Sequence, residues 1–345
     1  LTNNLELLVT APECLYDTGL KFATSAGPLR LQAADGKFSI EGEGFLWLPT
    51  NTCFFISNRV HTVVQPDLLE APSSNPRPEA SKSPQAGIDI FSHQFDYSGE
   101  SGLGTYRDEV RVAGAGLSMT SAVMTLVLPM KERQLKGISA RDNVTVDYGG
   151  VHANGQRVDY SVETGLVGVS GPPAPTWRTE LREGGADELI IDRTNRIFHA
   201  NGHSWLRMPG QSLGASGFLP RKAAPGVTTP GTNEFVEIAA GNYEVHNNSE
   251  HRTNWVVFRD QVRVKELDGA QTKGTMDCGL MTVTFSGTNE LQAMIAERQV
   301  VIQQEDMRLT GGKAVYSITN RLLELTEQPA WQALMDSLPK EVCHG

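Results

Sequence analysis

The sequence predicts an all-β protein, on the strength of alternating residue character, closely spaced turn signals and an internal repeat. Between Tyr106 and Val112, and again between Phe258 and Val264, apolar residues alternate with charged ones. Successive side chains of a strand point to opposite faces of a sheet. Each segment is therefore predicted to be a strand with one buried and one solvated face.

Dipeptides that favour tight turns separate the predicted strands. Glycine and asparagine adopt the left-handed backbone that two-residue hairpin turns require. Short strands at such regular spacing are typical of all-β architectures. One longer strand is predicted over Leu29–Ile40. The turn signals are Asp35-Gly36, Gly149-Gly150, Asn154-Gly155, Asn201-Gly202, Asp268-Gly269 and Gly311-Gly312.

One short C-terminal helix is predicted at Pro329–Leu338, where apolar residues recur at i, i+3, i+4 and i+7. We expect it to cap an exposed sheet edge. Residues 65–87 are rich in proline and serine, and residues 209–231 in glycine and proline. Proline cannot donate to a strand ladder, so both stretches are predicted linkers. They separate three β segments, at residues 1–64, 88–208 and 232–345.

The second and third segments repeat each other. TYRDEVRV at 105–112 matches VFRDQVRV at 257–264, an offset of 257 − 105 = 152. GISARDNVTV at 137–146 parallels MIAERQVVI at 294–302, and Tyr316 follows Tyr160 by 316 − 160 = 156. Matches in one order with nearly constant offsets indicate a duplicated β unit. A single hairpin cannot bury its apolar face, so neighbouring units must stack and share a core.

Composition excludes several classes of partner and site. Lys and Arg total 30 against 40 Asp and Glu, giving a net charge of −10, which disfavours nucleic acid as a partner. No apolar run approaches the roughly 20 residues of a membrane-spanning helix. The cysteines at 14, 53, 278 and 343 form no CxxC pair, which disfavours zinc. They are interpreted as unpaired thiols or, for Cys14 and Cys53, as one disulfide in an oxidising compartment.

Motifs for catalysis or metal binding are weak, and neither a cofactor nor a metal is expected. His199 and His203 have i, i+4 spacing, but Asn201-Gly202 between them indicates a β-turn instead of a metal-binding helix. Ser170 and Ser216 lack a GxSxG context and are interpreted as loop serines.

Asp108 and Asp260 occupy equivalent positions in the repeat, in phase with the inward-facing residues of their strands. We interpret them as buried carboxylates that accept backbone hydrogen bonds at a bend. The functional alternative is a polar ligand contact at the mouth of a cleft.

Six short segments carry a family resemblance. Their pattern, (D/N)-x-V-x-V followed by an alanine-led strand that ends in tyrosine, resembles the OstA-like family of periplasmic lipopolysaccharide-transport proteins, which includes LptA, LptC and the N-terminal domain of LptD. Residues 1–64 resemble the LptC-like version of the unit. The chain departs from the family in its longer linkers and at Arg298-Gln299-Val300. The six segments are Asp108–Val112, Ala140–Val146, Val158–Tyr160, Asp260–Val264, Ala296–Val300 and Ala314–Tyr316.

The resemblance implies an elongated, repeated β-jelly-roll, or β-taco, that holds lipid acyl chains in an apolar cleft without enzymatic chemistry. Moving a lipid tail out of water gains about 0.8 kcal/mol per CH₂ group. It also implies a periplasmic location, lipopolysaccharide or a related lipid as ligand, and homo-oligomers or other envelope transport proteins joined by β-strand addition. Alternation gives the candidate cleft lining: Tyr106, Val110, Val112, Val144, Val146, Tyr160, Phe258, Val262, Val264, Met281, Val283, Phe285, Val300, Ile302 and Tyr316.

Two other classes of function remain open from the sequence. The same repeat could build a structural envelope or filament scaffold whose core is filled by its own side chains. A β-helical polysaccharide-active enzyme would instead need carboxylates clustered on one exposed face.

Overall fold

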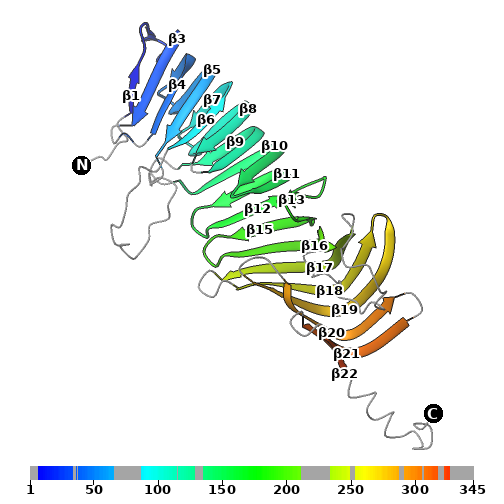
Figure 1. Ribbon diagram of the computed structural model, residues 1–345. Coiled ribbons are helices and arrows are strands. Elements are labelled where there is room, and N and C mark those ends of the chain that lie inside the picture. Colours follow the sequence, from blue (N-terminus) through cyan, green and yellow to red (C-terminus); the bar gives the residue numbers. More distant parts are fainter. Residues whose placement is uncertain are drawn as a thin grey trace, which may run out of the picture. The chain divides into compact units, whose positions relative to one another are not determined.

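The protein forms one long antiparallel sheet of 22 strands (Figure 1). The computed structural model describes residues 7–33, 36, 38–65, 87–114, 116–128, 135–210, 234–248, 253–286, 291–304, 307–317 and 322–326. These ranges contain no helix, and the predicted all-β class is confirmed. The helix predicted at Pro329–Leu338 lies outside them, as do most residues of the two predicted linkers.

The chain divides into two compact units. Unit 1 comprises Leu1–Trp177 and Asp192–Thr194, and unit 2 comprises Arg178–Ile191 and Asn195–Gly345. The segment boundaries predicted at the two linkers stay a prediction.

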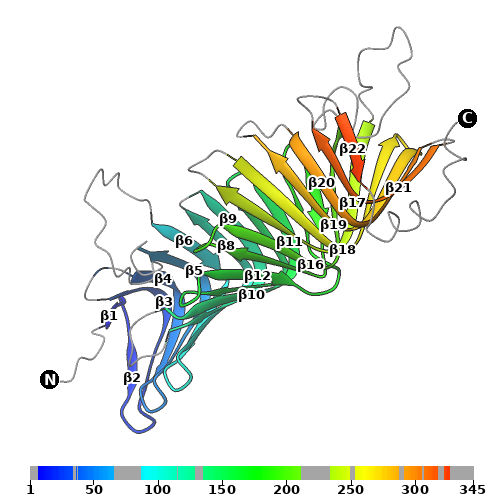
Figure 2. The same cartoon turned by 90° about the horizontal axis from the view of Figure 1, so that it is seen from below.

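The strands of unit 1 follow one another as antiparallel neighbours in chain order from β3 onward, as Figure 2 shows. One strand is split: β6 and β7 together bridge β5 and β8. The strands are β1 Leu7–Thr10, β2 Leu15–Asp17, β3 Phe22–Ala33, β4 Phe38–Leu48, β5 Cys53–Val64, β6 Ile88–Ser92, β7 Gln94–Ser98, β8 Leu103–Gly114, β9 Leu117–Val127, β10 Gly137–Tyr148, β11 Val151–Ser161, β12 Leu166–Ser170 and β13 Thr176–Arg178, the last of which ends in unit 2.

Unit 2 contains the longest strands of the described chain, and β16 to β22 again pair in chain order. The short β14 pairs with the end of β16. The strands are β14 Glu183–Gly185, β15 Glu188–Asp192, β16 Ile197–Pro209, β17 Glu234–Asn248, β18 Thr253–Asp268, β19 Gln271–Phe285, β20 Leu291–Gln304, β21 Met307–Ser317 and β22 Leu322–Thr326.

The predicted turn signals divide into two groups. Gly36, Gly149-Gly150 and Gly269 have positive φ at hairpin turns, and Gly36 interrupts the strand predicted over Leu29–Ile40. The turns predicted at Asn154-Gly155, Asn201-Gly202 and Gly311-Gly312 are wrong, since these pairs lie inside β11, β16 and β21. Glycine within a strand marks a bend or a close approach of backbones.

A bulge bends the long strands near their middle. In β8, β10, β18 and β20, two consecutive non-glycine residues have positive φ: 62° and 52° at Asp108-Glu109, 69° and 57° at Asp142-Asn143, 66° and 54° at Asp260-Gln261, and 69° and 58° at Arg298-Gln299. A bulge shifts the register and bends its strand. We call the line of bulges in each unit its corner.

The corner corrects one prediction. Asp108 and Asp260 are exposed, so the interpretation of both as buried inward carboxylates is wrong. The two left-handed residues turn the backbone, so that Tyr106 and Val110 both point inward while Asp108 between them points to solvent. Aspartate and asparagine are among the non-glycine residues that best tolerate this backbone.

The two copies of the repeat share their strand register. In unit 1, Ala140 pairs with Val158 and Ile138 with Tyr160. In unit 2, the residues 156 positions later pair in the same way, so that Tyr316 lies opposite Met294. The sequence repeat is therefore also a repeat of backbone geometry.

The corner divides each unit into two arms, each with an apolar inner face. Along β18, Val256 and Phe258 are buried before the corner, and Val262 and Val264 after it. In Figure 1, β18 and β19 curve strongly between their two halves. We call the half-strands that contain Tyr106 or Phe258 the first arm of their unit, and those that contain Val112 or Val264 the second arm.

Candidate functional site: the apolar interior

Glycines let neighbouring strands meet at the corner of unit 2. A Cβ atom on Gly241 would lie 2.8 Å from Cβ of Asp260, and one on Gly279 would lie 2.8 Å from Cβ of Arg298. Real Cβ atoms do not approach so closely, so each left-handed pair faces a residue without a side chain. The sheet can therefore fold here without separating its strands.

Tyr106 fills the centre of the interior of unit 1. Its side chain is fully buried, and its ring lies 4.7 Å from that of Phe95, centroid to centroid. The Tyr106 hydroxyl donates a hydrogen bond of 3.1 Å to Oγ1 of Thr62, which is also fully buried. Burial raises the pKa of Tyr106, so the hydroxyl stays protonated and can donate.

This hydrogen bond joins the two arms of unit 1. Ile56 pairs with Phe95, which pairs with Tyr106 in the first arm, whereas Thr62 pairs with Ile90 in the second. In a flat strand, the six residue-to-residue steps from Ile56 to Thr62 would span about 20 Å. A tyrosine side chain cannot reach so far, so the inner faces of the two arms must face each other.

Aromatic and methionine side chains fill the interior of unit 2. The rings of Tyr243 and Phe258 lie 5.4 Å apart, and both residues are at most 1% exposed. Methionine is unbranched and adapts to irregular spaces. Four methionines of unit 2 are also buried: Met208, Met276, Met281 and Met294.

The predicted lining residues lie on these inner faces. All fifteen are buried except Val146 and Tyr160, which are half-buried. The Tyr160 hydroxyl accepts a hydrogen bond of 3.1 Å from the Arg193 guanidinium, whose Cζ lies 5.6 Å from the centroid of the Tyr160 ring. The burial of these residues without any ligand present shows that they lie on an inner face. Their contact with lipid stays a prediction.

The outer faces carry charged pairs that bridge adjacent strands. Arg263 Nε lies 2.7 Å from Oδ1 of Asp277, and Lys313 Nζ lies 3.0 Å from Oε1 of Glu297. Exposed ion pairs of this kind contribute about 0–1 kcal/mol each. Their consequence is a polar outer face opposite an apolar inner one.

A denser group lies on the first arm of unit 2. Oε2 of Glu244 lies 3.1 Å from an Arg259 nitrogen and 3.2 Å from Nε2 of His246, and Oε1 lies 3.6 Å from Nδ1 of His199. Burial alone would raise the pKa of Glu244, but hydrogen bonds from Arg259 and His246 bring it below its usual value. The ring of His246 also stacks on that of Trp255, 4.8 Å away.

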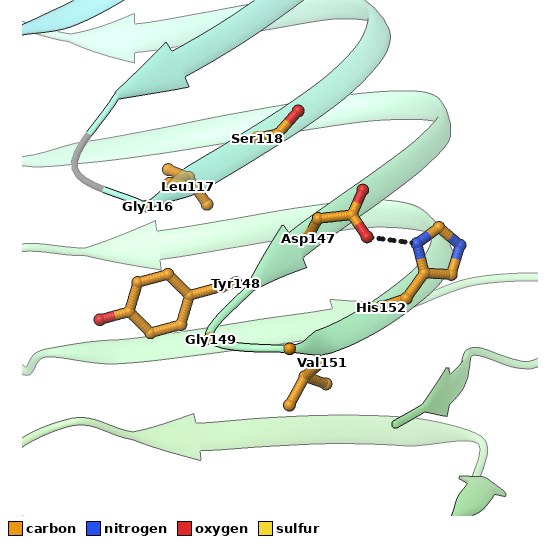
Figure 3. Close-up of a pocket in the computed structure, with 9 residues that line it drawn as sticks. Gly116, Leu117, Ser118, Asp147, Tyr148, Gly149, Val151 and His152 are labelled. Atoms are coloured by element: carbon orange, nitrogen blue, oxygen red, sulfur yellow. Dashed lines mark hydrogen bonds and ion pairs between the residues drawn. The ribbon is translucent and has the colours of Figure 1, made fainter. Parts of the chain in front are cut away.

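A hollow of about 300 Å³ lies at the hairpin ends of β9, β10 and β11 (Figure 3). Nδ1 of His152 lies 2.6 Å from Oδ1 of Asp147, and Tyr148 points to the other side of its hairpin. Cross-strand register places Asp147 between Ser118 and His152. A catalytic triad has histidine between serine and acid, so this cluster does not activate the serine.

The structure shows the surroundings of His199, His203, Cys14 and Cys53, which the sequence singled out. His199 and His203 lie on the bulged strand β16, where His203 Nδ1 lies 2.8 Å from Oδ2 of Asp187. No group of three or more histidine, cysteine, aspartate or glutamate residues in the described ranges could hold a metal ion. Cys14 and Cys53 are free thiols, so the structure contains no bridge between them.

Sequence reasoning missed the residues that fold the arms together. Thr62 gave no signal, because a threonine in an apolar strand is common. The corner did have a signal in the sequence, because the D-x-V and R-x-V triplets recur at matched positions. In addition, Gly241 and Gly279 lie in the strands beside Asp260 and Arg298.

The comparisons with known proteins include a partial similarity to a solved structure. No family model matches the chain, and no curated protein matches it. Among solved structures, the chain is similar to LptH of Pseudomonas aeruginosa, described as the LptA homologous periplasmic component of its lipopolysaccharide transport device. The match has a TM-score of 0.30 and 15% identity, and covers 41% of this chain and 95% of LptH. The similarity is weak and partial. Within the described residues, no helix is long and apolar enough to span a bilayer.

Proposed function

We propose that this protein is a non-enzymatic periplasmic carrier or bridge for lipopolysaccharide or a related lipid. The acyl chains lie between the inner faces of the arms, and the polar head remains outside. The observation that carries the proposal is the division of each bent strand into an apolar inner face and a charged outer face on both sides of the corner.

The resemblance in sequence supports the same function through particular residues. The segments that resemble the OstA-like family include the corner residues Asp108-Glu109 and Asp260-Gln261, whose left-handed backbone bends the sheet. The pattern thus coincides with the feature that creates an interior. Each CH₂ group moved from water into such an interior gains about 0.8 kcal/mol, so binding needs no covalent step.

The first and last strands of the sheet support strand addition as the mode of assembly. Among the described residues, β1 and β2 pair with β3, and β22 pairs with β21. Leu15, Leu20 and Leu322 are at least half exposed near these strands. Other envelope transport proteins, or further copies of this chain, would add a strand there.

A structural scaffold is the second candidate, and the tight burial inside both units favours it. Tyr106, Tyr243 and Met281 have exposed fractions of 0% in the chain alone. An acyl chain would therefore have to displace side chains or separate the arms, whereas a rod would keep its filled core.

The test is a binding titration with purified lipopolysaccharide. We expect saturable, low-micromolar or tighter binding, and lipid in the mass spectrum of protein purified from an envelope extract. Met281→Trp overfills the interior of unit 2 and should weaken binding at least tenfold. Thr282→Trp is the matched control, because Thr282 is the next residue of β19 and points to the other face.

Overpacking costs about 1–3 kcal/mol of stability. Circular dichroism is therefore needed to confirm that both variants still fold. Wild-type protein that binds no amphiphile and assembles into filaments would establish the scaffold and overturn the carrier. Equal binding by the Met281→Trp and Thr282→Trp variants would place the lipid outside the interior of unit 2.

A further inference from the structure

Four large apolar side chains gather at one end of the first arm of unit 1. Leu15 and Tyr16 of β2, Leu20 of the turn to β3, and Trp47 of β4 are between 42% and 74% exposed. Single exposed apolar residues are common on protein surfaces, whereas a contiguous group of them marks an interaction site. In Figure 2, the turn between β2 and β3 protrudes at the lower end of this arm. We call these four residues the tip patch.

Register places the tip patch on several sides of one hairpin. Tyr16 and Trp47 both pair with Ala23, which is buried on the inner face. Leu15 is the neighbour of Tyr16 and therefore points to the outer face, since side chains alternate along a strand. Leu20 lies in the turn that joins β2 to β3. Apolar side chains thus cover the inner side, the outer side and the end of the hairpin.

The turn satisfies two of its own backbone donors. The N–H groups of Gly19 and Leu20 donate hydrogen bonds of 2.8 Å and 2.7 Å to Oδ1 of Asp17. A backbone amide without a partner resists transfer out of water. The end of the hairpin can therefore enter a less polar environment without leaving these two donors unpaired.

Charges around the tip patch are few and balanced. Within residues 15–22, Asp17 and Lys21 are the only charged side chains, and their charges cancel. The next turn of the same arm, residues 49–52 between β4 and β5, has no charged residue. A layer of zwitterionic lipid heads carries no net charge either, and it offers Lys21 phosphate groups that a flexible lysine can reach.

We propose that the tip patch attaches unit 1 to the surface of a zwitterionic lipid bilayer. Leu20 inserts at the boundary of the acyl chains, and Tyr16 and Trp47 lie at the level of the lipid heads. Leucine favours hydrocarbon, whereas the rings of tyrosine and tryptophan, each with one polar group, favour the interface. The inference goes beyond the proposed carrier, because it adds a membrane surface on which the protein docks.

The arrangement of the patch favours a bilayer over a protein partner. A groove on another protein covers one side of a hairpin, whereas lipid surrounds an inserted hairpin and covers all of its sides at once. A strand added to β2 would pair with the backbone edge of that strand and leave Leu20 in the turn uncovered.

The experiment measures sedimentation of the full chain with sucrose-loaded vesicles of phosphatidylcholine and phosphatidylethanolamine. We expect wild-type protein to bind, and binding to persist at high salt, because insertion of apolar side chains is not screened by ions. Phosphatidylglycerol in the vesicles should weaken binding, because the chain has a net charge of −10. Leu20→Asp should weaken it at least about tenfold, because a carboxylate is costly to bring into a bilayer.

Leu181→Asp is the matched control. Leu181 is also exposed, at 55%, and belongs to unit 2, so this variant changes the charge equally and should bind vesicles as wild-type protein does. Circular dichroism checks the fold of both variants. Phosphatidylcholine with brominated acyl chains should quench the tryptophan fluorescence of wild-type protein, and Trp47→Phe should remove most of that quenching.

Three results would overturn the docking and leave the carrier in place: no binding to zwitterionic vesicles, binding to anionic vesicles alone that salt releases, or equal loss of binding in the Leu20→Asp and Leu181→Asp variants. Self-association of wild-type protein that Leu20→Asp abolishes, with vesicle binding unchanged, would assign the patch to a second copy of the chain and overturn the docking.

A titration with lipopolysaccharide separates the docking from the proposed function. Leu20→Asp should bind lipopolysaccharide as tightly as wild-type protein does. Loss of this binding together with vesicle binding would make the patch a part of the carrier's ligand site and overturn a separate docking surface. Wild-type protein that binds vesicles through Leu20 but binds no lipopolysaccharide would support the docking and overturn the carrier.

Discussion

Units 1 and 2 share a corner but differ in the length of their arms. Strands β8 to β11 have 11 or 12 residues, whereas β17 to β20 have 14 to 16. At about 3.3 Å per residue, three more residues add about 10 Å of strand. The corner residues keep nearly the same φ in both, so the fold is set at the corner and the size of the interior by the arms.

The units also differ in how their arms are joined. In unit 1, a neutral hydrogen bond from Tyr106 to Thr62 joins them near the corner. In unit 2, a cation–π contact from Arg182 to Phe285 joins them at their tips. A bond near the corner holds the arms without closing their open side, whereas a contact at the tips closes that side.

The largest expected effect is the loss of the Tyr106 side chain. Tyr106→Ala should lower the free energy of unfolding of unit 1 by about 3–5 kcal/mol, because it leaves a cavity in a closely packed interior. Tyr106→Phe keeps the ring and should cost about 1–3 kcal/mol, because the buried Thr62 hydroxyl loses its partner. Hydrogen exchange measured by mass spectrometry would report the two units separately. Equal loss of protection in unit 2 would contradict their division.

The next effect concerns the glycines of the corner. Gly279→Ala should destabilise unit 2 by about 1–3 kcal/mol, because its new methyl group would meet Cβ of Arg298. Gly168→Ala in unit 1 is the control, since a Cβ there meets no atom within 4 Å. Urea unfolding of both variants gives the comparison. A neutral Gly279→Ala would show that the strands at the corner can separate freely.

Substitutions of the left-handed corner residues should have a smaller effect on stability, and glycine should be tolerated better than valine. Gln261→Val should destabilise unit 2 by about 1–2 kcal/mol, although valine favours strands elsewhere, because a β-branched residue resists positive φ. Gln261→Gly should be close to neutral. Asn143→Val and Asn143→Gly test the same order in unit 1 by thermal unfolding. Valine as stable as glycine at either position would contradict a left-handed corner.

The smallest effect is a dependence on pH. The pKa of Glu244 is lower in the folded chain than its usual 4.5, so the unfolded chain binds the proton more readily. The ionised Glu244 side chain therefore contributes fully to stability at pH values above its usual pKa. This contribution is lost as the pH falls through the lower pKa that Glu244 has in the folded chain. Glu244→Gln should therefore reduce the loss of stability between pH 7 and pH 3, measured by urea unfolding. Asp159→Asn in unit 1 should do less, because its side chain is 46% exposed. A larger effect from Asp159→Asn would reverse this comparison.

Sequence alone predicted the strands well and the corner poorly. Alternation between Phe258 and Val264 gave the correct inner residues on both sides of Asp260, yet it also placed Asp260 inside. A period-two pattern assumes a continuous strand, and a two-residue bulge breaks that assumption without changing the letters around it. The turn predictions at Asn154-Gly155, Asn201-Gly202 and Gly311-Gly312 failed for a related reason, since a glycine at a bend within a strand resembles one at a hairpin.

The contacts between arms lay beyond any local pattern. Tyr106 and Thr62 are 44 residues apart, and Arg182 and Phe285 are more distant still. Such pairs depend on how far the corner closes, which is set by packing across the interior instead of by the sequence near either residue. The residues that line the interior could thus be predicted, whereas those that join the arms could not.

The most direct test of an interior that accepts acyl chains uses the unmodified protein. A single-chain lipid with a diazirine in its acyl tail is bound and photolysed, and its insertion sites are mapped by mass spectrometry. Along β19, insertion should occur at Met281 and Val283, which face inward, and not at Thr282 and Thr284, which face outward. Insertion confined to outward residues, or to the edge strands β1 and β22, would contradict the central claim.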